Sequence, residues 1–184
     1  LEWNTGFLDG NSFDEIIEIG AVKTDEEYRQ IDGFRRLIRP VIYRKMNPYI
    51  QKILAITMKD LQGEEPLASV AKAFFDWCGD CDTLIAWSGN DFGVLEKNLA
   101  HIGMKIPEQL GRYDVQMAYA YRTENSIRNY ALKTAVEAME LPEPEGQEYH
   151  DAYCDAQFTA AIGRALTERY GPLPAVEELQ ALKN

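Results

Sequence analysis

Apolar residues recur with two different periods along the chain and separate a β-rich first third from a mixed remainder. Phe13–Lys23 (FDEIIEIGAVK) is rich in Ile and Val and predicts a strand. Ile31–Pro40 predicts its partner, which ends at Pro40 because proline cannot donate a ladder hydrogen bond. The connection Thr24–Gln30 is short and charged, so we expect an antiparallel hairpin.

After this hairpin the apolar residues follow helical spacing. Asn47 followed by Pro48 is typical of a helix N-terminus. Thr57–Asp60 resembles a capping box with Asp in place of Glu. The run that begins at Glu65 ends at Gly79. The same period predicts further helices over Asp91–Ile102, Val115–Arg122, Ile127–Met139 and Asp151–Tyr170.

One short apolar run, Thr83–Trp87 (TLIAW), is typical of a central, buried strand. Together with the hairpin it predicts an α/β fold, in which a mixed β-sheet is antiparallel at one side and flanked by helices. The chain has 184 residues, without an internal repeat or a linker, so we expect a single domain over residues 1–184.

Composition excludes some classes of function and location. The formal net charge of −11 excludes a uniformly basic nucleic-acid-binding surface, but it leaves open a local basic patch or binding through metal ions. No stretch approaches the roughly 20 apolar residues that span a bilayer, so we expect no membrane partner. The 3 cysteines cannot form a disulfide framework, which favours a cytoplasmic location.

Two aspartates occupy positions where the helical period places apolar residues. Asp91 shares a helix face with Leu95, and Asp155 shares one with Phe158 and Ile162. A carboxylate in such a place is costly unless it pairs with a cation, accepts hydrogen bonds or binds a metal. The alternative is a partly exposed residue in the first turn, where the helix dipole favours a negative charge.

Two other polar residues lie next to predicted elements. His150 directly precedes the last predicted helix, whose N-cap would be Asp151, and lies five positions ahead of Asp155. It could face the same pocket as Asp155, or it could be a capping or surface residue. Glu2 lies in Leu1–Gly6 (LEWNTG), which is either the end of a truncated strand or a frayed terminus.

Three segments in this order carry a family resemblance. They are Leu1–Gly6 followed by Glu15–Val22 (EIIEIGAV), Trp87–Leu95 (WSGNDFGVL) and His150–Ala156 (HDAYCDA). They resemble the three motifs of the DEDDh 3′–5′ exonucleases, which have a ribonuclease-H-like fold. The forms LEWN and Tyr113–Gln116 (YDVQ) look most like the Eri-type exoribonuclease branch and its bacterial relatives. The family's first Asp should lie two residues before Glu2, so we expect it upstream of Leu1.

The resemblance implies a metal-dependent 3′–5′ exonuclease. Such an enzyme would hydrolyse phosphodiester bonds at the 3′ ends of single-stranded nucleic acid, RNA in preference to DNA, and release nucleoside monophosphates. It implies two Mg²⁺ or Mn²⁺ ions, which are hard ions that prefer carboxylate oxygens. Glu2 and Asp155 would bind metal directly, Asp91 would act through bound water, and His150 would be the general base. The alternative is a catalytically inactive binding or regulatory module with the same fold, which the missing first Asp supports.

Residues beside these motifs are candidates for substrate contact. Trp3, Asn4 and Thr5 follow Glu2, and Trp3 could stack under the terminal base or be a core or rim aromatic. A CxxC at Cys78–Cys81 has no second pair or nearby His, which argues against a zinc or redox site. A basic cluster could hold the strand or be a solvated hairpin face; it comprises Arg35, Arg36, Arg39, Arg44 and Lys45, with Tyr43 and Tyr49 nearby.

Overall fold

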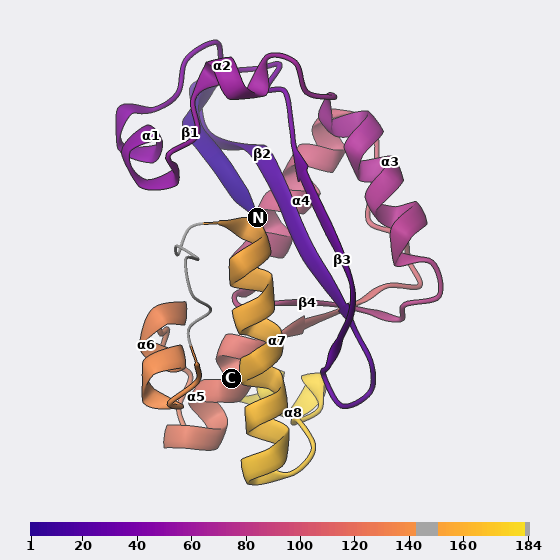
Figure 1. Ribbon diagram of the computed structural model, residues 1–184, viewed down its shortest axis with the longest axis vertical. Coiled ribbons are helices and arrows are strands. Elements are labelled where there is room, and N and C mark those ends of the chain that lie inside the picture. Colours follow the sequence, from indigo (N-terminus) through magenta and orange to yellow (C-terminus); the bar gives the residue numbers. More distant parts are fainter. Residues whose placement is uncertain (143–150, 183–184) are drawn as a thin grey trace.

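The first third of the chain forms a three-stranded antiparallel sheet (Figure 1). The computed structural model describes residues 1–142 and 151–182. The strands β1 (Glu2–Leu8), β2 (Asn11–Thr24) and β3 (Gln30–Leu37) follow one another in the order β1-β2-β3. The pairing of β2 with β3 confirms the predicted hairpin. Glu2 belongs to a paired strand and is not part of a frayed terminus, because it lies opposite Glu18 of β2.

A second sheet consists of two parallel strands, β4 (Thr83–Ala86) and β5 (Gly111–Asp114). The prediction of a buried central strand at Thr83–Trp87 is wrong as to burial, since Ile85 is 41% exposed. Within the described residues β4 pairs with β5 alone, so one of its edges carries no strand. The sequence pattern misses β5 because GRYD contains no apolar run.

Local sequence signals place most helix ends. Asn47 caps α1 (Pro48–Leu54) by accepting a hydrogen bond from the backbone of Tyr49. Thr57 and Asp60 form the predicted capping box of α2 (Met58–Leu61), and Gly79 ends α3 (Leu67–Cys78). The remaining helices are α4 (Gly89–His101), α5 (Val115–Glu124), α6 (Leu132–Ala138), α7 (Ala152–Tyr170) and α8 (Val176–Ala181). None of the helices in residues 1–142 and 151–182 has the length and apolar character to cross a bilayer.

The helix predicted over Ile127–Met139 is shorter in the structure, where α6 begins at Leu132. The backbone carbonyl of Tyr130 accepts hydrogen bonds from Trp87 Nε1 at 3.0 Å and from Gln116 Nε2 at 2.7 Å. These tertiary bonds hold the preceding segment outside the helix. The pattern also misses α8, which is a short helix after the Gly171 that ends α7.

Strand β2 is the centre of the packing, because α4 and α7 both lie against it (Figure 1). On the α4 side, buried Asn98 accepts from the Ile16 backbone at 3.1 Å and donates to the Asp14 carbonyl at 2.7 Å. Ile16 and Ile19 pack in one core cluster with residues of α3 and α4. This arrangement confirms the predicted fold class, and it brings the beginnings of β1, α4 and α7 together beside the middle of β2, near Glu18 and Gly20.

Candidate active site

Glu2 is the first residue of β1 and lies directly across the sheet from Glu18. The register shifts between Glu2 and Trp3, whose partner is Ile16, so β2 carries one extra residue at this point. Such a bulge re-aims neighbouring side chains, and bulges are common beside active sites. Two carboxylates therefore face each other where the strand register is broken.

Asp91 reaches the same place from α4. Ser88 caps this helix by accepting from the backbone of Asn90, so Asp91 falls in the first turn, where the helix dipole favours a carboxylate. Its side chain is 23% exposed, and its Oδ1 lies 3.2 Å from the backbone nitrogen of Leu1. This contact places Asp91 beside the residue that precedes Glu2. Leu95 of the same helix is buried, whereas Asp91 is a partly exposed residue of the first turn, which is the alternative stated above.

Asp155 reaches it from α7. Asp151 is the N-cap of α7, as predicted, and accepts from the backbone nitrogens of Tyr153 and Cys154 at 3.0 Å each. Asp155 therefore lies in the first turn, above the buried residues Phe158 and Ile162. This turn sits directly on Gly20 of β2, where an added Cβ would lie 2.1 Å from the Tyr153 nitrogen. Glycine at this position therefore sets how closely Asp155 approaches the sheet.

The electrostatics of Glu2 show that these carboxylates lie together. Burial is the largest cause that raises the pKa of Glu2 from 4.5 to about 8. The negative charges of Asp155, Glu18 and Asp91 raise it further. Each of these three carboxylates is therefore close enough to Glu2 to repel its charge, and a proton or a cation would relieve this repulsion.

A buried charge network supports the same site, and the sequence pattern alone does not reveal it. Glu18 is fully buried and accepts from Arg35 Nε at 2.8 Å and from the Ala152 backbone at 3.4 Å. Arg35 also forms an ion pair with Asp151. The guanidinium thus joins β2 and β3 to the N-terminus of α7. The available signal is that Glu18 stands among the isoleucines of EIIEIGAV, a place where a charge requires a partner.

The structure assigns contacts to the three candidate substrate residues. Trp3 is partly buried and packs against the core cluster of β2, α3 and α4. Asn4 is 1% exposed, and its amide donates to the Lys45 carbonyl at 3.0 Å and accepts from the Asn47 backbone at 2.8 Å. The hydroxyl of Thr5 donates to Asp14 at 2.8 Å. In this structure, therefore, all three side chains contact protein. The fourth predicted catalytic residue, His150, lies outside the described residues.

The three predicted metal ligands have the donor chemistry that a hard divalent ion needs. Glu2, Asp91 and Asp155 present carboxylate oxygens, the ligands that Mg²⁺ and Mn²⁺ prefer. A cation would also relieve the repulsion that raises the pKa of Glu2. Within residues 1–142 and 151–182, however, no group of three or more His, Cys, Asp or Glu side chains is arranged so that it could hold a metal ion. The donor chemistry suits a hard divalent ion, but the described residues alone do not form a metal site.

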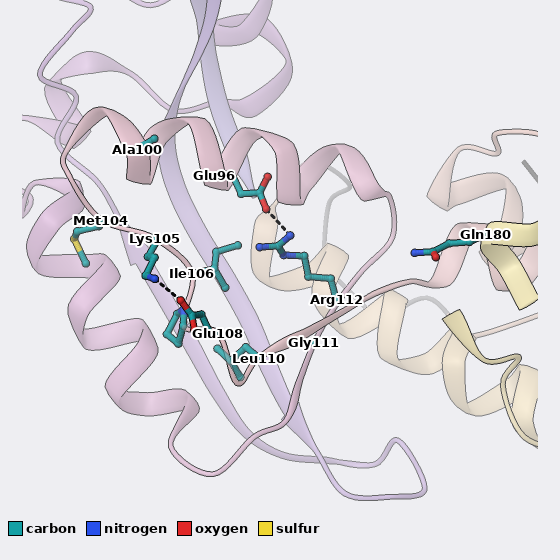
Figure 2. Close-up of a pocket in the computed structure, with 11 residues that line it drawn as sticks. Glu96, Ala100, Met104, Lys105, Ile106, Glu108, Leu110, Gly111, Arg112 and Gln180 are labelled. Atoms are coloured by element: carbon teal, nitrogen blue, oxygen red, sulfur yellow. Dashed lines mark hydrogen bonds and ion pairs between the residues drawn. The ribbon is translucent and has the colours of Figure 1, made fainter. Parts of the chain in front are cut away.

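Two other features lie apart from this site. A hollow on the opposite face of α4 is lined by Glu96, Ala100 and Met104 and is crossed by an ion pair of 2.6 Å from Arg112 to Glu96 (Figure 2). None of the predicted site residues lines it. In the CxxC segment, burial raises the pKa of the Cys78 thiol to about 11, which is the opposite of an activated thiolate.

Comparisons with known proteins agree with the fold of the chain. The model of the RNase_T exonuclease family matches residues 5–162. A PolC-type DNA polymerase III of Clostridium perfringens (strain 13 / Type A) is 28% identical over 161 residues, which are 86% of this chain and 10% of that protein. The chain therefore spans about a tenth of the length of this relative.

Solved structures show the same fold at low sequence identity. The nuclease domain of 3′hExo, a DEDDh family member bound to rAMP, has a TM-score of 0.75 at 16% identity, covering 94% of this chain and 92% of that chain. Exonuclease X in complex with 5′ overhanging duplex DNA has a TM-score of 0.65 at 20% identity, covering 92% and 91%. The ribonuclease-H-like fold is thus confirmed, and with the family match over most of its length the chain belongs to the RNase_T exonuclease family.

Proposed function

We propose that this chain hydrolyses phosphodiester bonds at the 3′ ends of single-stranded nucleic acid, with RNA preferred over DNA, and releases nucleoside monophosphates. The observation that carries the proposal is the convergence of carboxylates at the start of β1: Glu2 lies opposite Glu18, and Asp91 contacts the neighbouring Leu1. Burial, together with the charges of Asp155, Glu18 and Asp91, raises the pKa of Glu2 accordingly. An isolated cluster of carboxylates opposes folding unless it serves a cation. The family match and the DEDDh structural neighbours support a nuclease role for this cluster.

Each candidate residue has a role that follows from its chemistry. Glu2 and Asp155 would hold a divalent ion directly, and Asp91 would hold a second through water. Bound Mg²⁺ or Mn²⁺ would supply charge neutralisation at the phosphate and a lowered pKa of coordinated water. His150 would accept the proton of the attacking water. It is suited to this role because the carboxylates already supply the ligands that hard ions prefer.

The preference for RNA and for single strands rests on the resemblance to the Eri-type exoribonucleases. The structures with the same fold contain different nucleic acids: one shows recognition of a histone mRNA stem-loop by a 3′-exonuclease, and another is E. coli Exonuclease I in complex with a dT13 oligonucleotide. RNA and DNA strands of the same sequence must therefore be compared directly.

The test is cleavage of 5′-labelled RNA and DNA oligonucleotides of the same sequence, each with a free or a blocked 3′ hydroxyl. We expect stepwise shortening of the free 3′ ends with Mn²⁺, none with EDTA, and faster cleavage of RNA. Blocked ends should resist. Equal degradation of blocked and free ends would indicate an endonuclease. Binding without cleavage under every metal condition would support the inactive module instead.

A further inference from the structure

A stretch of the chain is basic without interruption, in a protein whose net charge is −11. Residues 33–59 contain no acidic residue. This stretch covers β3, the following loop and α1 up to the beginning of α2. It is the part of an acidic surface to which a polyanion would be attracted. Its basic residues are Arg35, Arg36, Arg39, Arg44, Lys45, Lys52 and Lys59.

Two of these basic residues, Arg44 and Lys45, are exposed, and neither forms an ion pair in the described part of the chain. Elsewhere basic side chains pair with neighbouring carboxylates, as Lys72 does with Asp76 and Arg164 with Glu168. The charges of Arg44 and Lys45 therefore remain available to a ligand.

The loop that carries these charges is held from beneath by a buried carboxylate. Glu15 of β2 is 4% exposed and accepts backbone hydrogen bonds from Val41, Ile42 and Tyr43 at 2.6, 2.8 and 2.9 Å. A carboxylate that accepts several charge-assisted hydrogen bonds holds its partners firmly. This part of the loop is therefore fixed before any ligand arrives, which lowers the entropic cost of binding.

A second buried anchor connects the loop to the candidate active site. The Asn4 amide joins the backbones of Lys45 and Asn47, and the Tyr43 ring lies over Gly6, where a Cβ would be 2.6 Å from its Cε1. Asn4 is two residues from Glu2, about 7 Å along an extended strand. The basic loop thus lies immediately beyond the carboxylate cluster along β1.

An aromatic ring stands in the first turn of α1, directly after this loop. Tyr49 is 70% exposed, although its backbone nitrogen is fixed by a 2.9 Å bond to Asn47 Oδ1. Proteins that bind single strands combine basic side chains along the backbone with exposed aromatic rings on which bases stack. We propose that Arg44, Lys45 and Tyr49 form a platform that binds the phosphates and a base of the nucleic-acid strand beyond its terminal nucleotide. The proposal rests on the function proposed above for the position of that terminal nucleotide.

The test measures binding separately from cleavage. In an Asp155→Asn background, fluorescence anisotropy would follow binding of a labelled 12-nucleotide single strand to the Arg44→Gln/Lys45→Gln variant. We expect its Kd to rise about tenfold at low salt, and the slope of log Kd against log salt to fall by about 1.4 for two lost phosphate contacts. The control is Lys72→Gln/Arg164→Gln, which removes the same charge from α3 and α7. It should bind as the parent does.

The aromatic contact has its own pair of variants. Tyr49→Ala should raise Kd about fivefold or more, since stacking on an aromatic ring contributes measurably per base, whereas Tyr49→Phe keeps the ring and should restore binding. With Asp155 intact, Arg44→Gln/Lys45→Gln should lower the ratio of kcat/KM for the 12-nucleotide strand to that for a dinucleotide about tenfold.

The outcomes separate the platform from the proposed function. Absence of cleavage by the parent chain with Mg²⁺ or Mn²⁺ would refute the exonuclease, while the binding titrations would still decide on the platform. The platform is refuted if its charge variant binds like the parent. It is refuted equally if the α3 and α7 control loses as much affinity, because the effect would then be one of net charge.

Discussion

The backbone nitrogen of Tyr153 lies 2.1 Å from the position that a Cβ of Gly20 would occupy. The first turn of α7 thus rests on the backbone of β2, and Asp155 is carried on that turn. Gly20→Ala should push α7 away from the sheet, because the obstacle is backbone and cannot rotate aside. We expect a loss of about 1–3 kcal/mol in the free energy of unfolding from overpacking. A misplacement of about 1 Å at Asp155 would lower kcat roughly 10²-fold.

The matched control for this change is Gly93→Ala. Gly93 lies in α4, two residues after Asp91, and a Cβ there would meet nothing within 4 Å. Alanine is the better helix former, so stability should stay equal or rise by up to about 1 kcal/mol. Urea unfolding measures the stability of both variants, and cleavage assays measure their kcat. Normal activity of Gly20→Ala would show that α7 does not depend on this close approach.

A second prediction concerns the ion pair between Arg35 and the fully buried Glu18. Arg35→Met would leave the Glu18 carboxylate buried without its cation and would release Asp151 at the start of α7. We expect a loss of about 2–4 kcal/mol, in the lower part of the usual range because the guanidinium is half exposed. Arg39→Met is the control, since Arg39 is also exposed but forms no ion pair within the described residues; it should change stability by less than about 0.5 kcal/mol. Similar losses in both variants would contradict a specific role for the network.

Local sequence signals are sufficient to predict those elements that are fixed by residues close to one another in the sequence. The β2–β3 hairpin, the Asn47 and Thr57 caps and the first-turn positions of Asp91 and Asp155 all follow from spacing and capping chemistry. The same signals do not predict β5, because its four residues contain no apolar run and are fixed by pairing with β4. Such short elements depend on tertiary contacts that periodicity does not contain.

In the candidate active site, too, local sequence predicts some residues, whereas others come together only through the fold. The first-turn aspartates were predictable, because a carboxylate on an apolar helix face stands out. The link of Glu18 to Arg35 and Asp151 joins residues far apart in the chain, and only the folded register of β2 and β3 brings them together. The motif predicts contact between Asn4 and the substrate, and the fold adds what the motif does not contain: the buried amide of Asn4 bonds to the backbones of Lys45 and Asn47. A motif identifies a residue's neighbourhood but not the direction of its side chain.

The third prediction is that Asp155→Asn removes activity and leaves the fold intact. Asparagine has the same shape as aspartate but lacks the charge that a divalent ion needs. Loss of outer contacts to a metal usually costs 10–100-fold, so loss of a direct ligand should leave below about 1% of kcat. Asp76→Asn on the exposed side of α3 is the control and should keep full activity. Undiminished cleavage by Asp155→Asn would refute the assignment of Asp155 as a metal ligand.

The fourth prediction concerns His150, which directly precedes the N-cap Asp151. If it is the general base, His150→Ala should lower kcat by roughly 10²–10⁴ and leave metal affinity nearly unchanged. The base must be neutral to accept a proton, so activity of the parent should fall as pH drops through the histidine pKa, near about 6.5 when unperturbed. The variant should lose this acid limb. A pH–rate profile and a metal titration of both proteins distinguish a general base from a metal ligand. Much weaker metal binding by the variant would make His150 a ligand instead.

The last prediction follows from the pKa of Glu2. Burial is the largest cause that raises this pKa from 4.5 to about 8, and the charges of Asp155, Glu18 and Asp91 raise it further. Between these two values the metal-free native state keeps a proton that the unfolded chain has lost. The stability contribution of Glu2 is therefore fully present below pH about 4.5 and is lost as pH rises to about 8, by at most about 1.4 kcal/mol per pH unit. Glu2→Gln cannot ionise, so its unfolding free energy should lack this decline.

Added Mg²⁺ should reverse the decline in the parent, because it binds the ionised carboxylate and stabilises the native state by mass action. Denaturant unfolding at pH 5 and pH 8, with and without Mg²⁺, measures the difference between the two proteins. A difference that does not change with pH would mean that Glu2 is not held among the other carboxylates as the structure shows.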